Sequence, residues 1–103
     1  MMSTQMPIQR TADTILDFLR AHHTELYAMG VDKIGLFGSY ARGEQRPDSD
    51  MDFLIQMRTP SYRDYMAVQH FLEDHLGGDI DLGEEDYLRE EIRPTVMREV
   101  RYV

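Results

Sequence analysis

Two short apolar runs constrain the fold more than any other part of the sequence. VDKIGLFG (residues 31–38) ends on a glycine, and DMDFLIQM (residues 50–57) begins with Asp50-Met51-Asp52. Both runs have the length and composition of buried strands. Side chains alternate between the faces of a strand, so Asp50 and Asp52 point the same way, roughly 6.6 Å apart, while Met51 faces the covering helices. Two carboxylates on one face are costly unless a cation compensates them.

Helical patterns on either side of these strands supply the covering layer. In residues 11–29 the apolar side chains recur at helical spacing, with Thr11 as the expected cap and Gly30 as the end. A second helix is predicted over residues 61–76, where Ser61 is the expected cap and a glycine pair stops the helix. Each of these two helices presents an apolar face to the strands.

A third short strand is predicted at residues 79–83, and the residues after it have helical composition. Pro94 disrupts a helix interior, so we expect a helical turn, a break near Arg93, another short helix and an extended end at Tyr102-Val103. The order helix, strand, strand, helix, strand, helix predicts an α/β fold, in which helices pack on a small sheet.

The length of 103 residues predicts one domain over residues 11–103, after a flexible N-terminus at residues 1–10. No apolar run reaches the roughly 18 residues of a membrane span, no cysteine is present, and the N-terminus lacks a signal-peptide pattern. We therefore expect a cytoplasmic protein. The net charge is -8 and the basic residues are scattered, so direct nucleic-acid binding is not expected.

The carboxylates on the second strand favour a divalent metal site. Oxygen ligands suit Mg²⁺, which commonly takes one or two carboxylates together with substrate phosphates. A third carboxylate on a neighbouring strand would allow two ions about 3.5 to 4 Å apart. Asp79-Ile80-Asp81 offers two candidates. We choose Asp81, which precedes Leu82 at a strand end, because Asp79 beside the glycine pair is typical of an exposed turn.

A phosphate site is predicted at the end of the first strand. Gly38 lets a ligand approach the backbone, and Ser39 begins a short helical turn whose free N–H groups attract anions. Arg42, one turn later, can donate several N–H groups to a phosphate oxygen. A Gly-Ser pair or an Asp-x-Asp alone is usually an ordinary turn or a solvated strand end, so the prediction depends on their combination.

Two other phosphate or metal motifs are excluded. Asp48, Asp50 and Asp52 match the start of an EF-hand loop, but Phe53 replaces the glycine of the sharp turn and Thr59 replaces the final glutamate. The segment around Gly38 also lacks the Gly-Lys-Ser/Thr of a P-loop.

The stretch GSYARGEQRPDSDMD resembles the signature of the DNA polymerase β-like nucleotidyltransferases, in which ten residues separate Gly-Ser from Asp-x-Asp. The small size and the tail IDLGEEDYLREEIRPTVMREVRYV are similar to the minimal nucleotidyltransferases, the MNT antitoxins of HEPN toxins. The resemblance implies a small mixed sheet flanked by helices. It also implies triphosphate binding by Gly38 and Ser39, and binding of two Mg²⁺ ions by Asp50, Asp52 and Asp81.

The resemblance further implies transfer of AMP from ATP to a tyrosine of a cognate HEPN toxin, which silences that RNase. The sheet, its helices and the nucleotide site use most of the chain, so we expect the acceptor on another macromolecule or a pocket completed by a second subunit, in a homo-oligomer or hetero-oligomer. The acidic charge favours a protein acceptor. Two alternatives stay open: an antitoxin that acts by binding alone, and a small-molecule nucleotidyltransferase of the aminoglycoside type.

Overall fold

The computed structural model describes residues 10–103, which form a four-stranded sheet in the order β3-β2-β1-β4. The strands are β1 (Val31–Phe37), β2 (Met51–Met57), β3 (Ile80–Glu84) and β4 (Arg101–Tyr102). Strand β1 is antiparallel to both β2 and β4, and β2 is parallel to β3. The sheet is therefore mixed and flanked by helices, which confirms the expected fold class.

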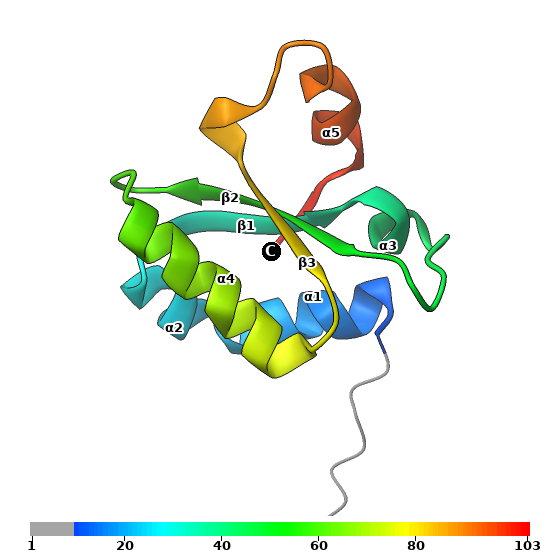
Figure 1. Ribbon diagram of the computed structural model, residues 1–103, viewed down its shortest axis with the longest axis horizontal. Helices are drawn as coiled ribbons and strands as arrows, with labels where there is room; N and C mark the ends of the chain where they lie inside the picture. The colour runs from blue at the N-terminus through cyan, green and yellow to red at the C-terminus, as the bar shows by residue number, and fades with distance from the viewer. Residues whose placement is uncertain (1–9) are drawn as a thin grey trace, which may run out of the picture.

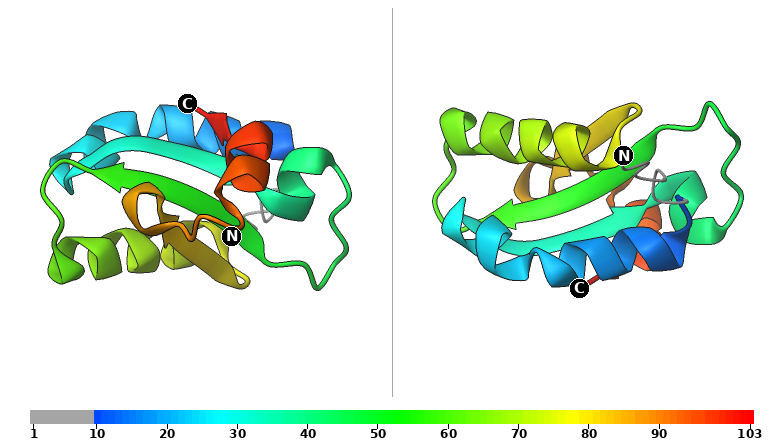
Figure 2. Two further views of the ribbon diagram at one scale, coloured as in Figure 1. Left: turned by 90° about the horizontal axis from the view of Figure 1, so that it is seen from above. Right: turned by 90° about the horizontal axis from the view of Figure 1, so that it is seen from below.

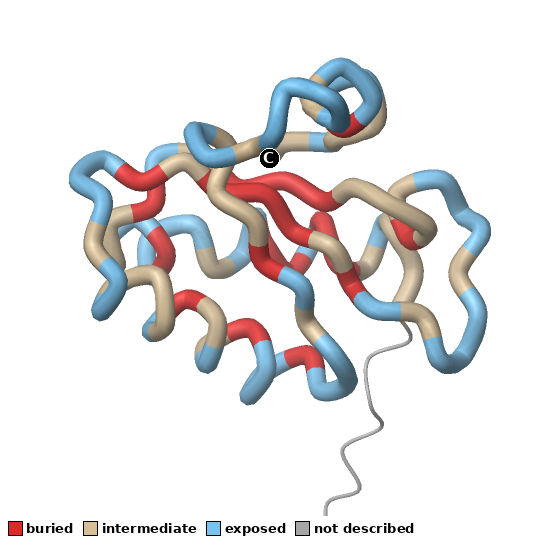
Figure 3. The backbone as a smooth tube through the Cα atoms, turned by 45° about the horizontal axis from the view of Figure 1, so that its top comes forward, coloured by how far each residue is buried: buried red, intermediate tan, exposed pale blue. Residues whose placement is uncertain are grey.

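Three helices cover one face of the sheet, and the C-terminal segment lies over the other (Figure 1). The covering helices are α1 (Ala12–Ala21), α2 (His23–Ala28) and α4 (Tyr62–Leu76). Figure 2 shows the α1–α2 pair and α4 as two rows along the sheet. Their apolar side chains form one core cluster with the inward residues of β1, β2 and β3. Figure 3 shows the buried parts of the strands and helices in red.

The helix predicted over residues 11–29 is two helices, because the chain bends at His22. The predicted cap is confirmed: the Thr11 hydroxyl accepts a hydrogen bond from the Thr14 N–H at 3.2 Å. No glycine or proline marks the bend, so periodicity alone could not place it. The His22 ring packs against Phe18 with ring centroids 4.4 Å apart, and Leu26 in the second helix is still buried.

The predicted strand ends shift by one residue on both sides of the polar motif. Gly38 does not close the first strand but begins α3 (Gly38–Arg42), with a positive φ of 75°. Asp50 precedes β2, whose first residue, Met51, donates its N–H to the carbonyl of Asp79 at 3.0 Å. The ladder between β2 and β3 thus starts after Asp50.

Helix α4 matches its prediction closely. Ser61 is the N-cap and accepts a hydrogen bond from the Asp64 N–H at 3.2 Å, and the helix ends at Gly77. Of the apolar face predicted from sequence, Leu72 and Leu76 are buried, whereas Tyr62 is 78% exposed. Tyr62, in the first turn of this helix, therefore does not join the core.

The C-terminal segment contains the short 3₁₀ helix η1 (Glu85–Tyr87), helix α5 (Arg93–Glu99) and β4. Pro94 lies in the first turn of α5, where its missing N–H costs no helical hydrogen bond, so the break precedes Arg93 rather than following it. Strand β4 pairs with β1 at Gly35, where the two backbones lie close together. A Cβ on Gly35 would lie 2.9 Å from the carbonyl oxygen of Arg101.

An ion-pair network fixes the C-terminal segment to the sheet. The Lys33 ammonium lies 3.2 Å from the Glu85 carboxylate and 4.6 Å from the ring centroid of Tyr102, whose hydroxyl donates to the same carboxylate. These contacts join β1, η1 and β4 on the face opposite the main helices. The hydrogen bond from Tyr102 lowers the pKa of Glu85.

Several expectations concern the chain ends and its surroundings. Residues 1–9 lie outside the described part of the chain, so the flexible N-terminus is not tested, and the division into one domain stays a prediction. Arg10, the first described residue, donates to the carbonyl of Leu76 at 3.3 Å. Across residues 10–103, no helix has both the length and the apolar character that a bilayer crossing needs.

Candidate active site

Asp52 and Asp81 lie side by side at one end of the sheet. They are direct partners in the parallel register of β2 and β3, and Asp52 is also opposite Phe37, the last residue of β1. Neighbouring strands are about 4.8 Å apart, so side chains at paired positions on one face are within contact range. The sheet thus brings together two carboxylates that are separated by a whole helix in the sequence.

The electrostatics of this pair are unusual for aspartates. Burial, followed by the negative charges of Asp81 and then Asp50, raises the pKa of Asp52 to about 6 from an ordinary value of 3.8. A hydrogen bond between the protonated Asp52 carboxyl and Asp81 acts in the same direction, and only the positive charge of Arg42 opposes it. The carboxylates of Asp52 and Asp81 therefore repel each other when both are charged, and a bound cation would remove this repulsion.

Asp50 has a different position from the other two carboxylates. It is exposed, lies just before β2 and acts on Asp52 through its charge. The structure therefore brings Asp52 and Asp81 into contact and leaves Asp50 at the rim of the same edge.

The backbone of Gly38 lies against the Asp52 carboxylate at this end of the sheet. Its φ of 75° is the left-handed conformation that favours glycine, and a Cβ there would collide with the Asp52 carboxylate. Phe37, the N-cap of α3, makes no side-chain hydrogen bond to the first turn of that helix. The backbone at Gly38-Ser39 thus lies directly against the carboxylate pair, at the start of a helical turn.

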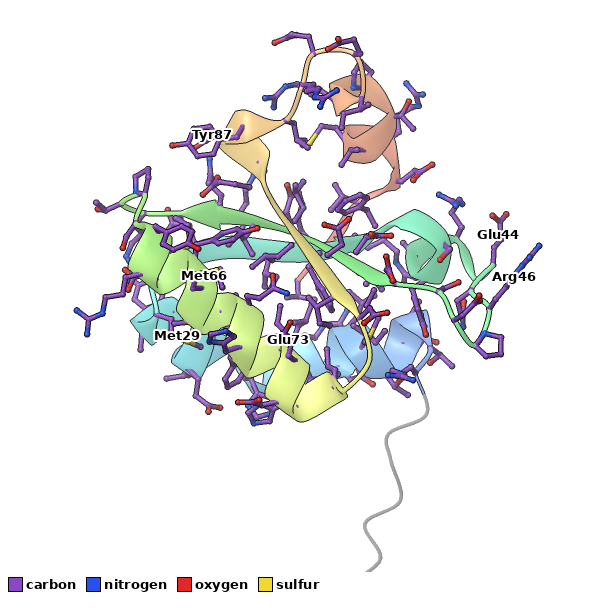
Figure 4. The ribbon with its side chains drawn as sticks, in the orientation of Figure 1. Met29, Glu44, Arg46, Met66, Glu73 and Tyr87 are labelled. Atoms are coloured by element: carbon purple, nitrogen blue, oxygen red, sulfur yellow. The ribbon has the colours of Figure 1, made fainter. Side chains whose placement is uncertain are left out.

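Arg42 forms ion pairs with two carboxylates. Its Nε lies 2.9 Å from Glu44, and its Nη1 lies 2.9 Å from Glu99 of α5. The hydrogen bond from Arg42 to Glu44 is the main reason why its pKa is raised. Figure 4 shows Glu44 on the loop that leaves α3. The contact with Glu99 could not be predicted from local sequence, because Glu99 is 57 residues away from Arg42.

The donor set at this edge fits Mg²⁺ bound together with a substrate. Within residues 10–103, no three acidic or histidine side chains form a metal site complete in itself. Mg²⁺ at phosphoryl-transfer sites usually takes one or two carboxylates and completes its shell with phosphate oxygens and water. Asp52 and Asp81 supply two carboxylates with oxygen donors only, next to the backbone predicted to hold phosphates.

Comparison with known proteins gives a consistent family relationship. Residues 13–103 match the family model of the nucleotidyltransferase domain. A protein adenylyltransferase MntA of Thermococcus cleftensis is 42% identical over 95 residues, which covers 90% of this chain and 96% of that protein. Both alignments contain the whole carboxylate edge and the start of α3.

Solved structures share the fold. A minimal nucleotidyltransferase superimposes with a TM-score of 0.78 at 29% identity, covering 91% of this chain and 97% of the other. The fold is also similar to that of a chain in a complex of a tri-AMPylated Shewanella oneidensis HEPN toxin with an MNT antitoxin, with a TM-score of 0.54 at 17% identity, covering 81% of this chain and 69% of the matched one. At that identity the second likeness concerns the fold alone.

Proposed function

The chain belongs to the nucleotidyltransferase domain family and is a protein adenylyltransferase related to MntA, and from this premise we propose that it transfers AMP from ATP to a tyrosine hydroxyl of a cognate HEPN toxin, acting as its antitoxin. The observation that carries the proposal is the contact of Asp52 with Asp81 beside the backbone of Gly38. The AMPylated HEPN toxin found with a protein of the same fold supports the choice of acceptor.

The nucleotide is held by its phosphates at the start of α3. Backbone N–H groups at Gly38 and Ser39 and the Ser39 hydroxyl donate to phosphate oxygens. Arg42 leaves its partners and adds a charge-assisted contact to the triphosphate. Because Gly38 has no Cβ, the phosphates can lie against the backbone within reach of Asp52.

The carboxylates bind the metal that accompanies the nucleotide. Asp52 and Asp81 hold Mg²⁺, and Asp50 contributes from the rim of the edge, as an additional ligand or through its charge. When bound, Mg²⁺ neutralises phosphate charge and lowers the pKa of the acceptor hydroxyl. Burial and the neighbouring carboxylates keep the pKa of Asp52 near 6, and a bound divalent cation would favour the charged form of this group.

The chemical step is an in-line displacement at the α-phosphorus. The acceptor oxygen forms a bond to this phosphorus while the bond to the bridging oxygen of the β-phosphate breaks, and pyrophosphate leaves with that electron pair. The proton of the hydroxyl passes to the carboxylate of Asp81, which lies on the edge strand β3. Positioning and charge stabilisation supply most of the acceleration.

The test combines the purified chain with a candidate HEPN partner protein, ATP and Mg²⁺, and measures the mass of the partner by mass spectrometry. We expect mass increments of AMP on a tyrosine-containing peptide of the partner. Asp52→Asn and Asp81→Asn should each slow transfer by orders of magnitude while partner binding persists. Inhibition of the toxin without any AMP increment would overturn the proposed transfer and leave an antitoxin that acts by contact.

A further inference from the structure

A groove of about 500 Å³ lies at the other end of the edge strand β3 from the carboxylates. It is lined mainly by Tyr62 and Tyr65 of α4, Tyr87 of η1 and Glu84 of β3, with Met57 and Pro60 at its base. Figure 4 shows Tyr87 on the turn that follows β3. Nothing in the proposed nucleotide chemistry uses these residues.

The aromatic walls of this tyrosine groove differ in how firmly they are held. Tyr65 is fixed, because its hydroxyl donates to the carbonyl of Leu82 and its ring packs against the core. Tyr62 and Tyr87 are 78% and 70% exposed, which is high for large aromatic side chains. Exposed tyrosines gathered around one hollow are typical of surfaces that bind a partner.

Glu84 gives the tyrosine groove a negative charge without a cation to balance it. Its carboxylate accepts a hydrogen bond from the Asp86 N–H at 3.3 Å, and no described residue forms an ion pair with it. Burial raises the pKa of Glu84, and the nearby charges of Asp86 and Glu85 add to that rise. Tyrosine faces together with a carboxylate attract a cationic group.

Near the groove, the free edge of β3 cannot readily pair with an added strand. Gln69 donates to the carbonyl of Ile80 at 3.1 Å, and Tyr65 donates to that of Leu82, so both carbonyls are already satisfied by α4. A partner strand would have to displace these contacts. The groove is therefore suited to a side chain and not to an extended backbone.

We propose that the tyrosine groove binds an arginine side chain of the acceptor protein. Arginine fits better than lysine, because a guanidinium can stack on tyrosine rings and donate to Glu84 at once. Glu84 lies three positions after Asp81 on the edge strand β3, which is roughly 10 Å along the strand, and the two side chains point to opposite faces of the sheet. A partner that fills the groove would therefore reach the carboxylates by extending around this edge strand. This inference rests on the proposed function for the identity of the partner, whereas the preference for a guanidinium can be tested without it.

The first experiment uses the isolated chain and a small probe. N-acetyl-arginine methylamide is titrated and followed by NMR, with the neutral isostere N-acetyl-citrulline methylamide as the matched control. We expect saturable shifts at Tyr62, Tyr87 and Glu84 with arginine, at least about tenfold weaker with citrulline. Equal shifts with both probes, or shifts elsewhere, would overturn the arginine site whatever the enzyme modifies.

The second experiment measures binding of the HEPN partner protein without ATP, together with the steady-state kinetics of AMP transfer. Glu84→Arg and Tyr87→Ala should each weaken partner binding at least about tenfold and raise the KM for the partner, with kcat and the affinity for ATP unchanged. Tyr27→Ala removes an exposed tyrosine of α2 outside the groove and should change binding less than twofold.

The two proposals fail in different ways. Wild-type AMP transfer together with unaltered binding by Glu84→Arg would contradict the groove and leave the activity intact. No AMP transfer by the wild type, together with arginine-specific shifts, would contradict the activity and leave the groove. Unfolding of either variant is checked by circular dichroism, and the probe titration on the wild-type chain remains decisive in that case.

Discussion

The two faces of strand β2 differ more than any other neighbouring parts of this molecule. Met51, Phe53, Ile55 and Met57 alternate along one face, and each is at most 5% exposed in the helix-covered core. Asp52 and Gln56 are half-buried on the other face, where Leu54 alone is fully buried, between Gly35 and Gly83 in register. One face of the strand thus packs into the core and the other carries the proposed catalytic carboxylate, so adjacent residues should respond to substitution in different ways.

The largest expected effect comes from the core face. Phe53→Ala should lower the free energy of unfolding by about 3–5 kcal/mol, because it removes a fully buried ring and leaves a cavity. Urea denaturation measures this change. Asp52→Asn, one residue earlier, should abolish AMP transfer without lowering stability. Comparable destabilisation by both variants would show that the two faces are not separate in function.

Gly38 and Gly43, at the two ends of α3, allow a matched comparison on the face that carries Asp52. Gly38→Ala should slow AMP transfer about a hundredfold, because a Cβ there collides with the Asp52 carboxylate and displaces it. Gly43→Ala is the matched control, since its φ of 73° imposes the same backbone strain with no atom within 4 Å of a Cβ. Both should lose about 1 kcal/mol of stability. Equal loss of activity in the two variants would mean that strain, not the contact, matters at Gly38.

Arg42 tests whether the functional face extends into α3. Arg42→Gln should raise the KM for ATP about tenfold through the lost phosphate contact, with less than about 1 kcal/mol of change in stability, because its ion pairs are on the surface. Arg20→Gln, which breaks the exposed ion pair with Asp17 on the other face, should leave the KM unchanged. If Arg42→Gln leaves the KM for ATP unchanged, Arg42 does not bind phosphate and only Gly38 and Ser39 remain as candidates.

The smallest effect is on the pH dependence of stability. The pKa of Asp52 is about 6 in the folded chain and near 3.8 when unfolded, so between these values the folded state binds more protons. The free energy of unfolding should therefore fall as the pH rises from 4 to 6, by about 1 kcal/mol after allowance for solvent screening. Asp52→Asn should flatten this part of the profile in urea titrations. If the wild type and Asp52→Asn show the same pH dependence of stability, other titratable groups cause it.

Local signals made much of this fold accessible from the sequence. The alternation in residues 50–57 placed Met51 in the core and Asp52 outside it, and the cap at Ser61 with the glycine stop defined α4 almost to the residue. The spacing of Gly38-Ser39 and the Asp-x-Asp identified the edge where Asp52 lies. Such features depend on side-chain periodicity and on backbone preferences of single residues, which neighbouring residues in the chain largely fix.

Other features could not be read from local patterns. The bend at His22 carries no glycine or proline, and the pairing of β4 with β1 depends on the close crossing at Gly35. The groove between α4 and η1 joins residues on either side of β3, so no single segment of sequence encodes it. These features depend on how elements pack, which the sequence specifies only through the whole fold.

The sequence by itself determined which residues could serve phosphate and metal chemistry, because strand alternation and glycine freedom are properties of adjacent residues. Only the tertiary structure decided that Asp81 lies against Asp52, that Glu99 holds Arg42, and that Asp50 stays at the rim. The physical reason is that strand register and helix packing bring distant segments together, and contact energies between such segments do not appear in any local pattern.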